Sequence, residues 1–291
     1  MINLIKRNLS IYFANRSVVF FSVFAALISF VLYLLFLKNS MQQGWRAVPG
    51  AGKLLDPWLI GGTLSVTGLT SIGAAISQMV IDREQHRLND LEMTDLSTLQ
   101  IQTGYLVGAV LIGTLNQIIA FLIMSFYFQI ADGVSIAWDQ SAAILGIAVF
   151  SSLVWTALNL LIYSFINRQQ SVSTISSIIG TVSGFMAGVY VPISTMPSVA
   201  QTIMKFTPAP YVSAAFRDVV MKQQLHDSFK HLPTSELKSF RLALGIDLKV
   251  GSTQLTMTDI FLVLGGFLLI FIVLLLLANY LRTKEVAGHA R

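Results

Sequence analysis

The 291-residue chain contains no cysteine and few charged residues. Without cysteine it forms neither a disulfide framework nor a thiolate site, which excludes cysteine nucleophiles and cysteine metal ligands. Only 11% of its residues are charged and 54% are hydrophobic, whereas soluble domains carry about 25% charged residues. This composition indicates an integral membrane protein.

The sequence motifs of several enzyme classes are also missing. The chain lacks the phosphate-loop pattern G-x-x-x-x-G-K-[ST], because the segment GAGK at 50–53 is followed by Leu54 and Leu55. The patterns H-E-x-x-H and G-x-S-x-G are absent, and the four histidines are widely dispersed. We therefore expect no catalytic residue, no metal and no cofactor in this chain, and no ATP hydrolysis by the chain alone. A membrane-embedded enzyme is disfavoured because no acids, bases or metal ligands converge.

Basic residues exceed acidic residues and give a formal net charge of +5. They are scattered along the chain, and no nucleic-acid recognition pattern accompanies them. We expect them to contact anionic lipid headgroups and not nucleic acid.

Six apolar stretches predict six membrane-spanning helices, because a hydrocarbon core about 30 Å thick needs about 20 apolar residues per helix. The predicted spans are residues 17–37, 57–81, 105–128, 142–166, 172–191 and 260–281. Together they predict one all-α transmembrane domain over residues 1–291. An even number of spans puts both termini on one side, and the distribution of Lys and Arg over the short loops favours the cytoplasmic side.

The fifth predicted span is the most polar of the six. Its Gly180, Gly184 and Gly188 recur every four residues and predict a smooth helix face for packing against a neighbouring helix. The alternative is a linker or a flexible helix.

The first 16 residues place apolar side chains, among them Ile2, Ile5 and Leu9, at helical spacing. This pattern predicts an interfacial helix on the inner leaflet. An unstructured basic tail is the alternative.

A charged segment at residues 82–99 separates the second and third predicted spans. It cannot stay in hydrocarbon, because Asp, Arg and Glu each cost roughly 2.5 to 3.5 kcal/mol at the centre of an inserted helix. Leu88 and Leu91 lie near helical spacing and favour a helix that docks on a partner; a solvated loop is the alternative. Ser97 and Gln100 form a capping-box pattern, so the next helix is predicted to begin there.

The polar residues inside the predicted spans are mostly neutral. A carrier driven by protons or sodium ions usually has embedded charged residues, so their absence indicates that energy is supplied from outside the membrane. Asn116, Gln117 and Asn159 are candidates for a polar translocation path. The alternative is that they form hydrogen bonds between helices.

Residues 192–258 are apolar at first but are repeatedly interrupted by proline, which breaks helices. They predict two short segments that enter the outer leaflet and return, followed by a small outer subdomain. We expect this subdomain to contain a short helix capped by Ser235 and ended by Gly245. The interrupting prolines are Pro192, Pro197, Pro208 and Pro210.

In the order of these parts, the chain resembles the membrane (permease) subunit of type 2 ATP-binding-cassette (ABC) exporters over essentially its whole length. The order is an amphipathic N-terminal helix, six spans, a charged loop after the second span and a proline-rich region before the last. The sequence departs from the family pattern at His86, Arg87 and Leu88, and at Thr94 and Asp95. The residues that carry the resemblance are Asp82, Arg83 and Glu84 and then Pro192, Met196, Pro197, Pro208, Pro210, Tyr211 and Arg217.

The resemblance implies a half-transporter of the bacterial cell membrane that exports an amphiphilic molecule such as a drug, an antimicrobial peptide or a lipid-like compound. It implies a separate ATPase subunit that holds ATP and magnesium, and a second permease subunit, the same or a related chain. A non-transporting sensor or immunity protein that binds a peptide through its outer loop is the alternative. The implied site residues are, for coupling to the ATPase, Asp82, Arg83, Glu84, Leu88 and Leu91, and for an outer gate, Pro192, Pro197, Pro208, Pro210, Tyr211 and Arg217.

Overall fold

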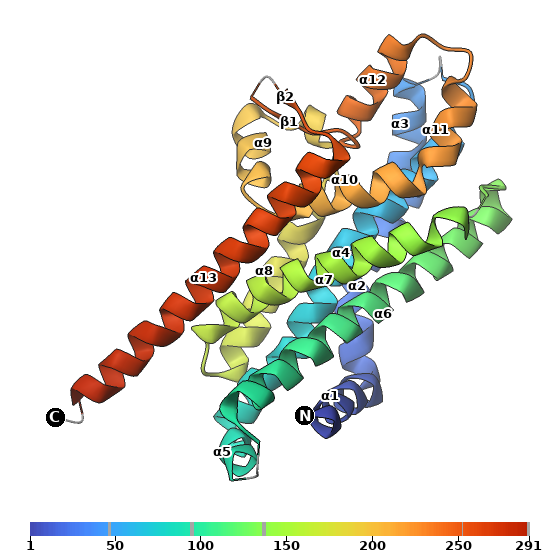
Figure 1. The fold of residues 1–291 in the computed structure, drawn as a ribbon. Helices are drawn as coiled ribbons and strands as arrows, with labels where there is room; N and C mark the ends of the chain where they lie inside the picture. Colours follow the sequence, from blue (N-terminus) through green and yellow to red (C-terminus); the bar gives the residue numbers. More distant parts are fainter. Residues whose placement is uncertain (46–47, 94–95, 136–137, 252, 290–291) are drawn as a thin grey trace.

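The structure, a computed structural model, describes residues 1–45, 48–93, 96–135, 138–251 and 253–289. It is almost entirely helical, which confirms the predicted all-α class (Figure 1). Its longest helices are α2 (Arg16–Leu32), α4 (Ala51–Glu84), α6 (Thr98–Asp132), α7 (Ser141–Ser164), α8 (Gln169–Met186) and α13 (Met257–His289).

Shorter elements connect these helices or extend them. A π-helical turn, η1 (Tyr33–Leu37), continues α2 into α3 (Lys38–Gly44). Two short strands, β1 (Lys249–Val250) and β2 (Thr253–Gln254), pair antiparallel. The remaining elements are α1 (Ile2–Ala14), α5 (Arg87–Glu92), η2 (Trp138–Gln140), η3 (Ile193–Thr195), α9 (Ser198–Lys205), α10 (Ala209–Val220), α11 (Lys222–Phe229) and α12 (Thr234–Ala243).

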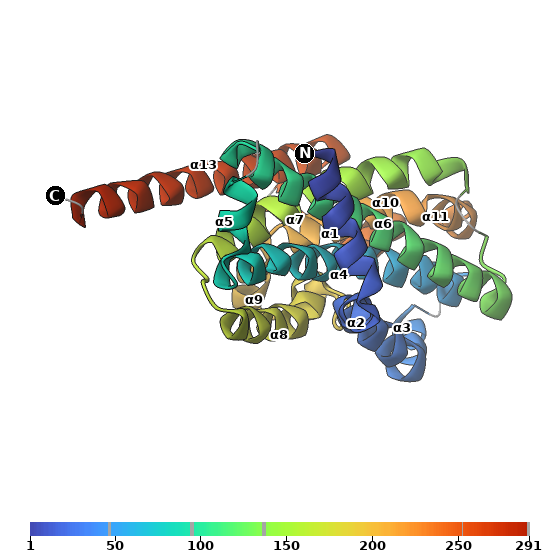
Figure 2. The same ribbon diagram turned by 90° about the horizontal axis from the view of Figure 1, so that it is seen from below.

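Helix α4 forms the centre of the molecule, and α2, α6, α7, α8 and α10 pack around it (Figure 2). Its glycines lie where neighbouring helices approach closely. A Cβ atom on Gly68 would lie 2.8 Å from the side-chain nitrogen of Gln117, and one on Gly73 would lie 3.0 Å from the Asn159 side chain. The small residues of α4 therefore permit the dense packing that surrounds it.

Among the described residues, four helices are long and apolar enough to cross a membrane. A fifth span is present if the two parts of the bent segment 16–44, which meet at 48°, are counted as one. These five correspond to predicted spans one to four and six. The fifth predicted span, which forms α8, is too polar to meet the same criterion, so the count of six is not confirmed.

Helix α1 packs lengthwise along α6, and it buries Leu4, Asn8 and Tyr12. Gly104 and Gly108 of α6 face it, and a Cβ atom on Gly104 would lie 2.6 Å from the Leu4 side chain. The predicted N-terminal helix is present. Ile2 is exposed, and Ile5 and Leu9 are half-buried. That this helix lies on the inner leaflet stays a prediction.

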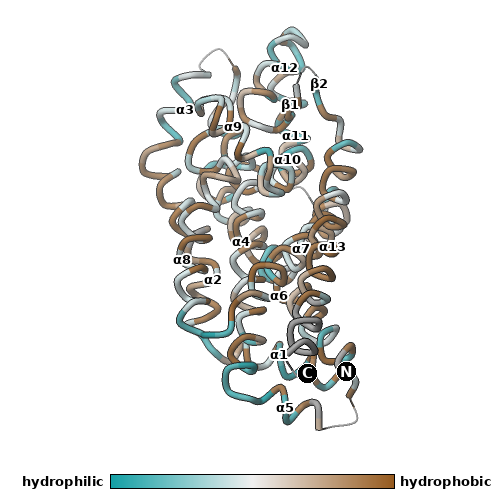
Figure 3. Tube along the Cα trace, turned by 90° about the vertical axis from the view of Figure 1, so that its left-hand side faces the viewer, coloured by the Kyte–Doolittle hydropathy of each residue, from teal (hydrophilic) through white to brown (hydrophobic). Residues whose placement is uncertain are grey.

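The two ends of the molecule carry different elements (Figures 1 and 3). We call the end that holds α1, α5 and the last turns of α13 the α5 end. We call the opposite end, which holds α3, α9, α11, α12 and the hairpin, the α12 end. The charged segment and the N-terminal helix therefore lie together, far from the region that follows α8.

Several local predictions are confirmed and two are wrong. The Gln100 backbone N–H donates to the Ser97 hydroxyl at 3.3 Å, and the Ser97 backbone N–H donates to the Gln100 side chain at 3.0 Å, so α6 begins with the predicted capping box. Gly245 ends the predicted short helix with a φ of 64°, but that helix begins at Thr234, so Ser235 does not cap it. Gly188 has a φ of 63° and lies beyond the end of α8. The three glycines at 180, 184 and 188 therefore do not share one helix face.

Candidate functional site

The carboxylate of Asp82, near the end of α4, is buried and fully engaged inside the chain. Arg7 of α1 donates to its two oxygens at 2.8 and 3.1 Å, Tyr105 of α6 donates at 2.5 Å, and Gln78 donates at 2.8 Å. The hydrogen bond to Asp82 raises the pKa of Arg7 above its usual value, so this guanidinium stays charged. Arg87 of α5 lies 3.7 Å from Asp82, so this carboxylate joins α1, α4, α5 and α6.

The next two residues tie the same end of α4 to two further helices. Arg83 donates to the carbonyl oxygen of Ile166, just after α7, at 3.2 Å. Glu84 accepts a hydrogen bond of 2.8 Å from the backbone N–H of Gln169, the first residue of α8, where a carboxylate also suits the helix dipole. We call Asp82, Arg83 and Glu84 the 82–84 junction. Each of its residues contacts a different neighbour.

Helix α5 follows the 82–84 junction after a sharp turn at His86, whose φ is 59°. Leu88 and Leu91 are half-buried and pack against the core, whereas Arg87 and Asp90 are exposed. Asp95 lies outside the described residues. The polar surface of α5 is therefore the part of the charged segment that remains accessible to a partner.

The three polar residues predicted for a translocation path are buried between helices. Asn116 donates to the Tyr12 hydroxyl of α1 at 3.0 Å. Gln117 exchanges hydrogen bonds of 2.9 to 3.0 Å with two serines of α7, and Asn159 donates to the Leu69 carbonyl of α4 at 3.4 Å. Each of these hydrogen bonds joins two helices. The structure therefore shows the alternative role for these residues, hydrogen bonding between helices.

Arg217 of α10 is fully buried at the other end of the bundle. Its guanidinium lies 4.5 Å from the centre of the Trp58 ring, over the ring face, and it donates to the Trp58 carbonyl at 3.2 Å. The other acceptors are the carbonyl oxygens of Ala187 and Gly188, after α8, and of Leu244 and Gly245, after α12, at 2.9 to 3.5 Å.

We call these acceptors and the guanidinium the Arg217 cluster. Carbonyls at a helix C-terminus carry partial negative charge and lack intrahelical partners, so a buried cation is stabilised there without a carboxylate. Gly61 and Gly62 of α4 make room for it: a Cβ atom on Gly61 would lie 2.8 Å from the Arg217 backbone nitrogen. The sequence indicated Arg217 through the family resemblance, but not these partners.

The prolines of residues 192–210 lie at the starts of short helices. Pro192 precedes η3, Pro197 precedes α9, Pro208 precedes α10 and Pro210 occupies its first turn. Tyr211 donates to the carbonyl of Lys205 at 3.0 Å and so holds α10 against the end of α9. Two short helices, α9 and α10, are present in this region. That they enter the outer leaflet and return stays a prediction.

A buried ion cluster near the start of α4 was missed by sequence reasoning. Lys38 lies 2.9 Å from Asp56 and 2.8 Å from Asp132, and Tyr33 donates to Asp56 at 2.7 Å. The predicted span began at residue 57, but the helix starts at Ala51, so Asp56 is helical and fully buried. The expectation that embedded charged residues are absent therefore does not hold at this position.

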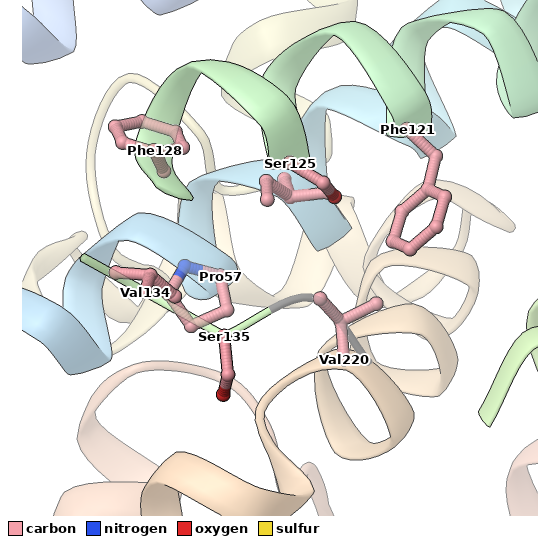
Figure 4. A pocket seen from close by; sticks show the side chains of 8 residues that line it. Pro57, Phe121, Ser125, Phe128, Val134, Ser135 and Val220 are labelled. Atoms are coloured by element: carbon pink, nitrogen blue, oxygen red, sulfur yellow. The ribbon is translucent and has the colours of Figure 1, made fainter. Parts of the chain in front are cut away.

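A cavity between α4, α6 and α10 is lined by Pro57, Phe121, Phe128 and Val220, among other residues (Figure 4). Its volume is about 10 Å³, and a single water needs roughly that much space. It is a packing gap and not a site for cargo.

A family model described as "ABC-2 family transporter protein" matches residues 56–281. The chain belongs to this family, and it is therefore a multi-pass membrane subunit of an ABC transporter that acts with an ATP-binding subunit and is not the ATPase itself. The match includes the 82–84 junction and the Arg217 cluster. Among curated proteins, no sequence matches the chain.

Proposed function

We propose that this chain is the permease subunit of an exporter that moves an amphiphilic molecule out of a bacterial cell. In this proposal the α5 end and both termini face the cytoplasm, basic residues contact lipid headgroups, and ATP and magnesium bind on the separate ATPase subunit. The observation that supports it best is the 82–84 junction. It connects the end of α4, which leads into the exposed α5, to α1, α6, the end of α7 and α8.

The 82–84 junction suggests how a movement of α5 would reach the bundle. Asp82 is buried, so we propose that it holds α1 and α6 and does not itself touch the ATPase. Arg83 and Glu84 would pass the movement to the end of α7 and the start of α8. Leu88 and Leu91 would set the position of α5, and its exposed face would contact the ATPase.

The exposed face of α8 supports a path between two permease subunits. Ser173, Thr174, Ser177 and Thr181 are exposed on it, and each hydroxyl donates to the carbonyl four residues earlier. Small and hydroxyl-bearing residues are typical of helix interfaces inside membranes and not of lipid-facing surfaces. We propose that this face lies toward a second permease subunit, with the cargo path beside it.

At the outer end, α9, α10 and the Arg217 cluster would form the gate of this path. Arg217 contacts the C-terminal ends of both α8 and α12. A movement of α8 that opens the path therefore has to change the contacts of the outer region.

Coupling to the ATPase is tested by the double substitution Glu84→Arg with Leu88→Asp in an affinity-tagged chain purified from its native membrane. We expect the native chain to copurify with a phosphate-loop ATPase and the double variant to lose it. The matched control is Glu236→Arg with Leu237→Asp in α12, which changes the same residue types at the opposite end. Equal retention of the ATPase by both variants would contradict the proposed docking surface.

A further inference from the structure

A cavity of about 380 Å³ lies at the α12 end, between the end of α10, the residues after α12, the hairpin and the start of α13. This volume falls in the range of small-molecule sites, about 300 to 1,000 Å³. Its lining includes four apolar residues, Ile246, Leu255, Met257 and Ile260, which we call the apolar wall. None of the residues described above as candidate site residues lines it.

The cavity lining also contains charged groups whose hydrogen-bonding capacity is only partly used by one another. Arg241 lies 2.6 Å from Asp218 and 2.6 Å from Asp247, and these ion pairs raise its pKa above the usual value. Asp247 uses both oxygens, because its second oxygen accepts from Arg241 at 2.9 Å and from Gln254 at 2.7 Å. Among the described residues, only one oxygen of Asp218 accepts a hydrogen bond.

This arrangement leaves an excess negative charge inside the cavity. Two carboxylates face one guanidinium, and the second oxygen of Asp218 has no partner among the described residues. A carboxylate oxygen in a partly enclosed site is a strong acceptor for a charged N–H donor. The apolar side chains of the lining, Ile246, Leu255, Met257 and Ile260, suit a hydrocarbon or aromatic body.

We infer that this cavity binds a primary ammonium group carried on an apolar body, with the ammonium on the free oxygen of Asp218 and the body against Ile246, Leu255 and Met257. A quaternary ammonium fits less well, since it lacks N–H donors and is recognised by aromatic rings. The described residues that line the cavity include no aromatic residue.

The first turn of α13 keeps the apolar wall in place. Asp259 accepts hydrogen bonds of 2.8 Å from both the backbone N–H and the hydroxyl of Thr256. This cap fixes the turn that carries Met257 and Ile260. The wall therefore does not have to form when the ligand binds, which lowers the entropic cost of binding.

The inference rests on the proposed function only for placing the cavity on the outer side of the membrane, where an amphiphilic amine would meet it. Binding itself is a property of the purified chain. A failure of ATPase copurification with intact amine binding would reject the proposed function alone. A loss of amine binding with intact copurification would reject this inference alone.

The test uses dansylcadaverine, a fluorescent dansyl group that carries a primary amine, and its N-acetylated neutral form. Both are titrated into the full chain in detergent. We expect the amine to bind about tenfold more tightly than the acetylated form, as one charge-assisted hydrogen bond provides. Equal affinity of the two probes would overturn the inference.

Asp218→Asn should abolish the preference for the amine, while Asp218→Glu should retain it. The matched control is Asp227→Asn, which removes one exposed carboxylate of the same region outside the cavity lining and should leave the preference unchanged. If Asp227→Asn lowers the preference as much as Asp218→Asn, the probe responds to net charge and the proposed binding site is wrong.

Met257→Trp, which fills the cavity, should weaken binding of both probes. Unchanged binding of both probes would show that they bind elsewhere.

Discussion

The two ends of the bundle stabilise buried charge in different ways. At the α5 end, Asp82 is held by side chains from α1, α4, α5 and α6, and two of these side chains are the oppositely charged Arg7 and Arg87. At the α12 end, Arg217 is held by an aromatic ring and by backbone carbonyls at the ends of α8 and α12. The first arrangement depends on which side chains are present. The second depends on where helices end.

Within the proposed function, this difference suggests separate roles for the two ends. A junction made of side chains moves as one unit as long as its ion pair persists, which suits the transmission of force. A guanidinium that is bound to helix ends loses acceptors when any of those ends shifts. Its free energy therefore changes with the conformation of α8, which suits a gate.

The largest effect is expected from Arg217→Ala. It should lower the free energy of unfolding by about 3 to 5 kcal/mol, because backbone carbonyls lose their donor and a large buried side chain leaves a cavity. The measurement is the detergent unfolding temperature. The control is the exposed Arg168→Ala, which should change it little. Equal unfolding temperatures for the two variants would show that the Arg217 cluster does not stabilise the chain.

Asp82→Asn should destabilise the chain by about 2 kcal/mol, because it breaks a buried, charge-assisted contact while Arg7 can still reach solvent. The rate of backbone amide hydrogen exchange should rise more in α1 than in α7. Combined with Arg7→Gln, the loss should be much smaller than the sum of the two single losses, since both remove one interaction. Fully additive losses would contradict the ion pair.

Gly61→Ala should cost about 1 to 3 kcal/mol, because its Cβ atom would collide with the Arg217 backbone. The matched control is Gly180→Ala, since nothing lies within 4 Å of a Cβ atom there. That control should be neutral or should stabilise α8 by up to about 1 kcal/mol. A Gly180→Ala variant that loses ATP-driven export but keeps its unfolding temperature would support a partner on the exposed face of α8.

The smallest effect is expected from Ser97→Ala, about 1 kcal/mol, because it removes the cap of α6. Hydrogen exchange should rise in the first turn of α6 only. The matched control is Ser173→Ala, whose hydroxyl bonds only within its own helix. A comparable rise of exchange in α1 would show that the cap also supports the contacts of Tyr105.

Features that depend on neighbouring residues in the sequence could be predicted, and features that depend on distant partners could not. Ser97 and Gln100 predicted the start of α6, and Gly245 predicted the end of α12. Both predictions were possible because helix capping depends on residues only a few positions apart. The acceptors of Arg217 lie up to 159 residues away in the chain, so no local pattern reveals them. Asp56 lies just before the predicted second span of residues 57–81, yet α4 begins at Ala51 and continues through Pro57.

The glycines of α8 show a further limit of periodicity. Gly180, Gly184 and Gly188 are evenly spaced, but a left-handed backbone at Gly188 ends the helix. Spacing alone cannot distinguish a glycine that continues a helix face from one that terminates it. The fold class and the order of elements were therefore predictable, whereas the exact partners of the site residues required the structure.

The claim that α5 receives force from an ATPase is tested most directly by crosslinking, and the absence of cysteine makes the experiment specific. A single Asn89→Cys on exposed α5 is labelled with a photoreactive maleimide in native membranes, and Ser239→Cys on exposed α12 serves as the control. We predict a covalent adduct between the Asn89→Cys chain and a phosphate-loop ATPase, and none from Ser239→Cys. An ATPase adduct from Ser239→Cys without one from Asn89→Cys would contradict the assignment of the α5 end as the coupling surface.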